Sequence, residues 1–257
     1  YTEELQRGTL SQLGVDPANL TAILKPVELT RVNTAEQREN IGESMGAILA
    51  YALVLLCLSG AMYPAVDMGA GEKERGTLET LLICPVSRTA IVLGKFLTVL
   101  TTALMTALIT VVSLGVWGGI ISAFADLSKV SEALASITIV DLMLMFSLLL
   151  PTAAIFAALL LAISIYARTF KEAQNYMSPL TILVIVPLMI AMAPGMELDV
   201  TTALIPLTNI ALAIKELLKG TADYGLLALI FASTTALAGA LIAFCVHWFQ
   251  QEKVLFR

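Results

Sequence analysis

The residues with the most chemical promise lie in a short charged island between two long apolar runs. Gly71 and Gly76 are spaced like the two glycines of a phosphate-binding loop, G-x-x-x-x-G-K-[ST]. The lysine of that motif is missing, because Thr77 follows Gly76 directly. Glu72 and Glu74, which lie between the glycines, would also repel a phosphate group. The island is therefore not expected to bind a nucleotide, and any ATP chemistry must belong to another chain.

A stripe of hydroxyl groups follows the island in the next apolar run. The stripe consists of Thr98, Thr102, Thr106, Thr110 and Ser113. On a helix with 3.6 residues per turn, these side chains occupy about a third of the circumference. Their oxygens would suit a wet pathway for a hard cation. Hydroxyls in spans more often bond to their own backbone or pack against a neighbouring helix, so packing is the favoured interpretation and a pathway is the alternative.

Other catalytic patterns are missing from the sequence. It contains no His-Glu-x-x-His, no Gly-x-Ser-x-Gly and no pair of aspartates in the middle of an apolar run. The sole histidine, His247, lies beside Trp248 at the end of a run, where an aromatic membrane anchor is favoured over a metal ligand. Asp67 and Asp141 also lie near run ends, so a buried proton relay is not expected. We predict no catalytic residues, and metal ligands remain unassigned.

The apolar runs that position these residues are long enough to cross a membrane. The chain is 58% hydrophobic and 14% charged, with a mean hydropathy of +0.87, whereas about a quarter of the residues in soluble domains are charged. A bilayer core needs roughly 20 apolar helical residues. Five runs meet this length without alternating polar and apolar residues: 44–66, 91–117, 139–167, 177–194 and 225–249. The sequence predicts an all-α integral membrane protein with a helical bundle of five visible transmembrane spans.

Lysine and arginine are concentrated in the loop that holds the island. This loop carries Lys73, Arg75, Arg88 and, at the start of the next span, Lys95. The following loop carries only Lys129. Because short basic loops stay in the cytoplasm, the island and the tail 250–257 are predicted to be cytoplasmic. Residues 1–43 are then predicted to be the last part of an extracytoplasmic region. No signal or earlier span in the chain would export that region, so a sixth, upstream span is expected in the full protein.

Two loops on the predicted outer side carry short amphipathic helices, near 126–137 and 209–219. Neither is long enough to cross, so each is expected to lie at the interface or to dip in partway. Small residues also recur four apart, in Gly42, Gly46 and Ala50 and in Ala232, Ala236 and Ala240. Such stripes predict close helix contacts, either within the bundle or between two copies.

The segment 67–90 has the features of a cytoplasmic docking elbow. Gly69 and Gly71 are predicted to let the chain leave the first visible span and turn, while Glu72 and Arg75 pair on a short helix. An apolar ridge then ends before Pro85, and it comprises Leu78, Leu81 and Leu82. The alternative is a solvated loop whose leucines rest on lipid headgroups.

Residues 71–82, GEKERGTLETLL, together with Pro85-Val86-Ser87-Arg88 and Leu93-Gly94-Lys95, resemble the stretch after the second span of ABC-2-type permeases. The likeness is strongest to the NatB-like, sodium-exporting branch. The segments 59–67, SGAMYPAVD, and 205–209, IPLTN, resemble the same branch. The resemblance extends in order and spacing over most of residues 41–249.

The resemblance implies six spans in each permease, a large outer domain, and paired permeases served by separate ATPase subunits. In this family the elbow contacts the ATPase. By matching position, that contact would comprise Glu72, Lys73, Glu74, Arg75, Gly76, Thr77, Leu78, Glu79 and Thr80. The implied partners are an ABC ATPase subunit, which would use ATP and Mg, a second permease copy or paralogue, and the lipid bilayer, but no nucleic acid. The implied location is a bacterial or archaeal cytoplasmic membrane.

The expected function is that of the permease subunit of an ATP-driven exporter, with sodium as the cargo that the resemblance favours and no ATPase site of its own. Export of drugs, lipids or peptides through the same architecture is the alternative. An intramembrane enzyme or a secondary transporter is disfavoured, because the sequence lacks the motifs and the mid-span charges that those classes need.

Overall fold

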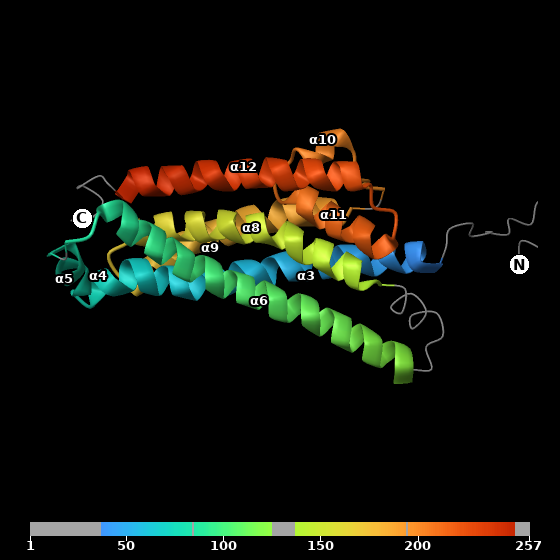
Figure 1. Ribbon diagram of the computed structural model, residues 1–257, viewed down its shortest axis with the longest axis horizontal. Helices are drawn as coiled ribbons and strands as arrows, with labels where there is room; N and C mark the ends of the chain where they lie inside the picture. The colour runs from blue at the N-terminus through green and yellow to red at the C-terminus, as the bar shows by residue number, and fades with distance from the viewer. Residues whose placement is uncertain (1–36, 84, 125–136, 194, 250–257) are drawn as a thin grey trace, which may run out of the picture. The chain divides into compact units, whose positions relative to one another are not determined.

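The computed structural model describes residues 37–83, 85–124, 137–193 and 195–249, which belong to one compact unit, Glu36–Arg257. Among these residues there are helices and no strands (Figure 1). The elements are α3 (Gln37–Val66), the π-helical turn η1 (Asp67–Gly71), α4 (Glu72–Glu74), α5 (Thr77–Ile83), α6 (Arg88–Phe124), α8 (Ile139–Tyr166), α9 (Phe170–Ala191), α10 (Val200–Ala203), α11 (Thr208–Lys219) and α12 (Tyr224–Phe249).

Within the described part of the chain, five helices are long and apolar enough to cross a membrane. They are Met45–Glu74, Arg88–Ile121, Ile139–Tyr166, Phe170–Ala191 and Tyr224–Trp248. The first of them runs from α3 through η1 into α4. The prediction of an all-α membrane protein with five visible spans is confirmed.

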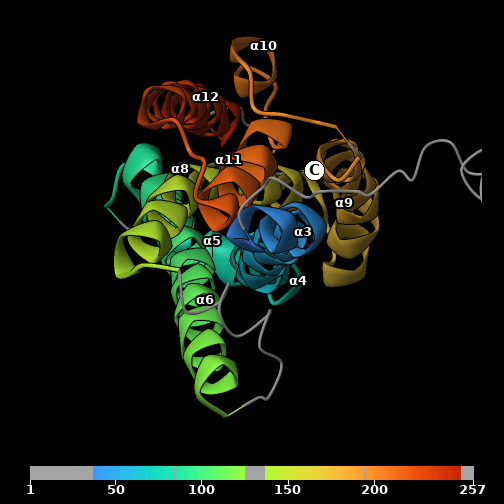
Figure 2. The same cartoon turned by 90° about the vertical axis from the view of Figure 1, so that its right-hand side faces the viewer.

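Helix α8 lies at the centre of these spans, in contact with α3, α6, α9, α11 and α12 (Figures 1 and 2). Its side chains are buried around most of the helix, among them Leu149, Phe156 and Leu160. A helix with partners on several sides needs no polar face, so its sequence is apolar all round rather than striped. Its residues therefore form part of one continuous apolar core with those of α3 and α6.

Helix α9 begins earlier than the sequence predicts, at Phe170 instead of residue 177. Thr169 Oγ1 accepts a hydrogen bond from the backbone N–H of Glu172, at 3.2 Å, and the Glu172 carboxylate accepts one from the backbone N–H of Arg168, at 2.8 Å. The first bond satisfies an N–H group that a helix start leaves free, and the second fixes the residue before the N-cap. The Thr-x-x-Glu pattern was present in the sequence, but an apolar-run criterion overlooks the polar first turns.

Helix α11 is buried from Thr208 to Leu218 and packs against α3, α8 and α9. This burial favours insertion among the spans over a position at the surface for the predicted 209–219 helix. Its start is held by Thr208 Oγ1, which donates to the Pro187 carbonyl at 3.2 Å, and by Asn209 Nδ2, which donates to the Ala203 carbonyl at 2.9 Å. The other predicted interfacial helix, near 126–137, falls on residues 125–136, which lie outside the described residues.

The first stripe of small residues packs α3 against α11. A Cβ atom added at Gly42 would lie 2.7 Å from the Lys219 Cα, and one added at Gly46 would lie 3.5 Å from the Lys215 Cα. The close contact predicted for this stripe is therefore within the chain. Ala232, Ala236 and Ala240 are instead exposed on α12. Their close helix contact stays a prediction.

Candidate functional site: the elbow after the first span

The first span does not end where the island begins. The chain stays helical through η1 and α4 to Glu74, and Gly69 and Gly71 are buried within this stretch. The expected turn at these two glycines is therefore wrong. The chain turns at Gly76 instead, where φ is +72° and the backbone N–H donates to the Lys73 carbonyl at 3.1 Å. Glycine adopts this left-handed conformation without steric cost, so Gly76 ends the helix. We use "elbow" below for residues 67–83 together with Pro85 and Val86, and "tip" for its exposed residues from Thr77 to Val86.

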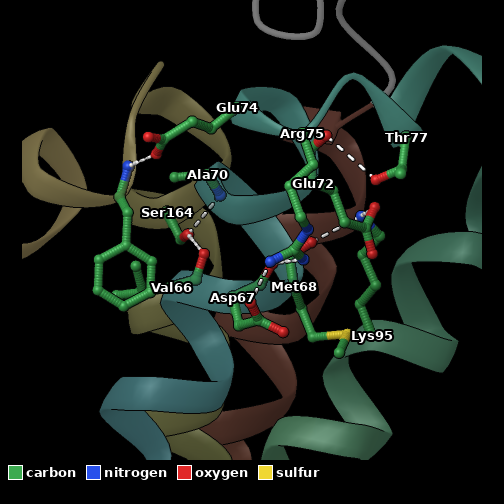
Figure 3. A network of polar contacts seen from close by, with 11 residues as sticks. Val66, Asp67, Met68, Ala70, Glu72, Glu74, Arg75, Thr77, Lys95 and Ser164 are labelled. Atoms are coloured by element: carbon green, nitrogen blue, oxygen red, sulfur yellow. Dashed lines mark hydrogen bonds and ion pairs between the residues drawn. The ribbon is translucent and has the colours of Figure 1, made fainter.

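Gly69 has a different role, because it lets α8 approach the elbow closely. A Cβ atom at Gly69 would lie 2.2 Å from the Ser164 Oγ and 2.8 Å from the Ser164 carbonyl carbon. Ser164 is fully buried and its hydroxyl accepts a hydrogen bond from the Ala70 N–H, at 2.9 Å. The same hydroxyl donates to the Val66 carbonyl, at 3.3 Å (Figure 3). The glycine therefore permits a contact between helices.

The charged side chains of the elbow bind partners other than those expected. Arg75 pairs with Asp67 at 2.7 Å, and Glu72 forms an ion pair with Lys95 of α6 (Figure 3). These contacts replace the expected Glu72–Arg75 pair. Lys95 is only 6% exposed and also donates to the Met68 carbonyl at 2.7 Å. The hydrogen bond from Arg75 to Asp67 raises the pKa of the guanidinium above its ordinary value.

Two further contacts attach the elbow to α8 and α9. The Glu74 carboxylate accepts a hydrogen bond, at 2.7 Å, from the backbone N–H of Phe170, the first residue of α9. A carboxylate is favourable there, because the N-terminus of a helix carries partial positive charge. Lys73 Nζ donates to the Ile165 carbonyl near the end of α8. Glu72, Lys73 and Glu74 thus bind three different spans.

The rest of the elbow divides into a buried and an exposed side. Leu78 is 6% exposed and Leu81 packs against the core, so these two members of the predicted ridge face the bundle. The outward-facing residues are Thr77, Thr80, Ile83, Pro85 and Val86. Ile83 is 84% exposed and Val86 is 52% exposed. The side chains of Glu79 and Leu82 lie outside those that the structure describes.

Most hydroxyls of the stripe on α6 donate hydrogen bonds to the backbone of their own helix. Thr98, Thr102, Thr106 and Thr110 each donate to the carbonyl four residues earlier, at 3.0, 3.2, 2.9 and 2.7 Å. Thr106 also packs against Gly60 of α3, where an added Cβ would lie 2.3 Å from its Oγ1. Thr98 and Ser113 are exposed. These contacts fit the packing interpretation, and the pathway interpretation stays a prediction.

Two residues of the elbow contacts were not singled out from the sequence as site residues. Lys95 contributes to the predicted orientation of the spans and to the family resemblance, although a lysine at the start of an apolar run is also a signal for an ion partner. Ser164 gave no signal, because a single serine in an apolar helix most often bonds to its own backbone. Among the described residues, no group of three His, Cys, Asp or Glu side chains could hold a metal ion.

The arrangement is a helical elbow whose charges are anchored to three spans and whose tip exposes Ile83 and Val86. A family model described as "ABC-2 family transporter protein" matches residues 4–256. The chain belongs to the ABC-2 transporter family. ABC-2 proteins are membrane components of ABC transporters, and the five span-length helices agree with a multi-pass ABC-2 permease.

A curated relative gives the same family. The chain is 29% identical over 227 residues to the "ABC transporter permease protein NatB" of Bacillus subtilis (strain 168). The match covers 87% of this chain and 56% of that relative, so the chain spans a little over half the length of the ABC-2 permease it matches. No solved structure matches the chain.

Proposed function

We propose that the chain is the membrane-spanning part of an ATP-driven exporter and that its elbow docks on a separate ATPase subunit. This proposal rests on one observation: one part of the elbow is bonded to the spans, and the other part, the tip, exposes apolar side chains. Glu72, Lys73 and Glu74 hold α6, α8 and α9, while the tip leaves its apolar residues uncovered. A segment held in this way can transmit the displacement of a bound partner to several spans together.

The contact with the ATPase lies on the tip, centred on Ile83 and Val86. The contact inferred from the resemblance included Glu72 to Arg75, but these side chains already bind partners inside the chain. Large exposed apolar side chains are the usual anchors of a protein interface, and Thr77 and Thr80 supply a polar rim beside them. ATP and Mg would be bound by the partner subunit.

The docking surface is tested by replacing Ile83 and Val86 with serine. Co-purification of the ATPase subunit should fall by about tenfold or more, because apolar anchors dominate the binding energy of interfaces. The matched control replaces Val200 and Leu204, which are 55% and 59% exposed near α10, away from the elbow (Figure 1). If both double variants retain the ATPase equally well, the elbow tip is not the docking surface.

Sodium is the cargo that we propose, on the likeness to the sodium-export branch and to the NatB permease. Membrane vesicles that contain both subunits and internal ²²Na⁺ should show ATP-dependent sodium movement across the membrane. Vesicles with the Ile83 and Val86 double variant provide the control for leak. Absence of ATP-dependent sodium flux, with ATP hydrolysis intact, would redirect the proposal to a drug, lipid or peptide cargo.

We further propose that the protein resides in a bacterial or archaeal cytoplasmic membrane, with the elbow and the C-terminus in the cytoplasm, and works with a second permease copy or paralogue. The orientation rests on the lysines and arginines of the elbow loop. The pairing rests on the family resemblance. Labelling of single cysteines at positions 77 and 200 with a membrane-impermeant reagent tests the orientation, since only the residue on the outer side should react in intact cells.

A further inference from the structure

Ser164 stands inside the hydrogen-bond ladder of the first span. In an α-helix the Ala70 N–H would donate directly to the carbonyl of Val66, four residues earlier. Here the Ser164 hydroxyl lies between these two groups, accepting from Ala70 at 2.9 Å and donating to Val66 at 3.3 Å (Figure 3). The bridged stretch coincides with the π-helical turn Asp67–Gly71. A side chain of α8 thus completes the backbone of a different span.

The bridge explains how the wider turn persists in a buried place. A π-helical turn contains an extra residue relative to an α-helix and is uncommon. The Ala70 N–H and the hydroxyl of Ser164 are both buried, and unpaired buried polar groups are costly. With the hydroxyl present, both backbone groups are paired while the turn remains wide. Without it, the Ala70 N–H regains a partner only if the turn tightens to an α-helix.

Tightening would change the direction of every side chain beyond the turn. Removal of one residue from the turn rotates the following helix by about 100° relative to the span. Glu72 would then no longer face Lys95, and Glu74 would no longer face the Phe170 N–H. Ser164 therefore sets the register in which the elbow meets α6 and α9.

Gly69 shows that this approach of α8 is specific. An added Cβ would lie 2.2 Å from the Ser164 Oγ, 2.6 Å from its Cβ and 2.8 Å from its carbonyl carbon. Because one of these atoms is backbone, a rotation of the serine side chain would not make room. Glycine at position 69 and serine at position 164 form one contact, which we call the Ser164 joint.

We propose that Ser164 is a positioning residue for transport, and that the Ser164 joint holds the elbow in the register in which movement of the docked ATPase reaches α6, α8 and α9. This inference rests on the proposed function. The role of the Ser164 joint is distinct from the docking proposed above, because docking depends on the tip and the joint acts only after docking.

The test compares Ser164→Ala with Thr152→Ala in the complex with the ATPase subunit. Thr152 is also a fully buried hydroxyl of α8, but it donates to the Leu148 carbonyl of its own helix. For Ser164→Ala we expect unchanged co-purification and an approximately tenfold fall in permease-stimulated ATP turnover, the factor that corresponds to one buried hydrogen bond. Hydrogen exchange of the Phe170 N–H, which loses its Glu74 partner when the elbow rotates, should accelerate by a similar factor. Thr152→Ala should leave all three measurements unchanged.

Ser164→Cys separates hydrogen bonding from packing. A thiol is somewhat larger than the hydroxyl and leaves no cavity, but it is a weak donor and acceptor, so this variant should lose turnover as Ser164→Ala does. It also supplies the test if the alanine variant does not fold.

Turnover equal to wild type in Ser164→Cys, or in a folded Ser164→Ala, would overturn the proposed role of the joint and leave the docking proposal standing. Loss of co-purification in either variant would also overturn it, because the joint would then serve docking. Undiminished co-purification in the Ile83 and Val86 double variant would instead overturn the proposed function.

Discussion

At one end of α3, Glu43 binds Lys215 of α11, with Glu43 Oε1 and Lys215 Nζ 2.6 Å apart. Lys219 adds ion pairs to Glu43 at 3.3 Å and to Glu216 at 3.1 Å. Near the other end, the elbow charges bind a lysine of α6, a carbonyl of α8 and the N-terminus of α9. The first group, the α11 cluster (Glu43, Lys215, Glu216 and Lys219), holds one helix against another. The elbow charges distribute their bonds over three spans.

The difference indicates which group serves stability and which serves movement. Lys215 is 2% exposed, so its charge depends on Glu43 and on the Met196 carbonyl, 3.2 Å away. Removal of one partner from a buried charge is strongly destabilising. Arg75 of the elbow is 53% exposed, and water can replace its partner. Lys95 differs from Arg75, because it is buried like Lys215. We therefore expect changes in the α11 cluster to unfold the protein and most changes in the elbow to uncouple it.

The largest effect is expected for Glu43→Gln. This change leaves Lys215 buried without an ion partner and should lower the free energy of unfolding by roughly 3 kcal/mol, as for other broken buried pairs. Lys215→Met should cost less, because Glu43 is 42% exposed and water can hydrate its carboxylate. Thermal unfolding in detergent measures both. Equal losses in the two variants would contradict the view that the buried lysine is the sensitive partner.

The next effect in size is expected for Gly69→Ala. Its methyl group would collide with Ser164, and overpacking of this kind costs about 1–3 kcal/mol. Because the collision lies at the joint, ATP turnover should fall as well, which no change in the α11 cluster should cause without unfolding. Gly94→Ala in α6 is the matched control, since no atom lies within 4 Å of its added Cβ. It should raise helix stability slightly. A Gly69→Ala variant with normal turnover would contradict the view that changes in the elbow, unlike those in the α11 cluster, reduce turnover.

A smaller effect should appear at acidic pH. Burial raises the pKa of the Glu43 carboxyl, but hydrogen bonds from Lys215 and Lys219 outweigh it, so the pKa lies below the ordinary value. A carboxylate with a lowered pKa stabilises the fold above its unfolded-state pKa, and this contribution is lost as the pH falls through the folded-state pKa. Unfolding midpoints of the wild type should therefore fall on acidification. Glu43→Gln should show a flatter acid limb, and identical limbs would exclude Glu43 as the group responsible.

The sequence predicted the elements of both regions better than the contacts within them. Apolar runs are sufficient to place spans, because length and hydrophobicity are local properties. The turn was predicted at Gly69 and Gly71, whereas Gly76 makes it. All three are glycines in one short segment, and only the approach of Ser164, far along the chain, distinguishes a glycine needed for contact from one needed for a turn. The pairing of α8 with η1 is tertiary, and no local pattern encodes it.

The smallest change in stability is expected for Arg75→Gln, and it gives the sharpest contrast with Glu43→Gln. The Asp67–Arg75 pair is solvent-exposed, so its loss should not measurably shift the unfolding midpoint. Arg75 nevertheless binds back across the π-helical turn, from the end of α4 to the first residue of η1. Because this bond spans the turn that sets the register of the elbow, the variant should combine a wild-type midpoint with reduced ATP turnover. Lys171→Gln, at an exposed position in the first turn of α9, is the control for loss of a basic charge and should retain full turnover. A lowered midpoint in Arg75→Gln would place the elbow, like the α11 cluster, among the regions that stabilise the fold.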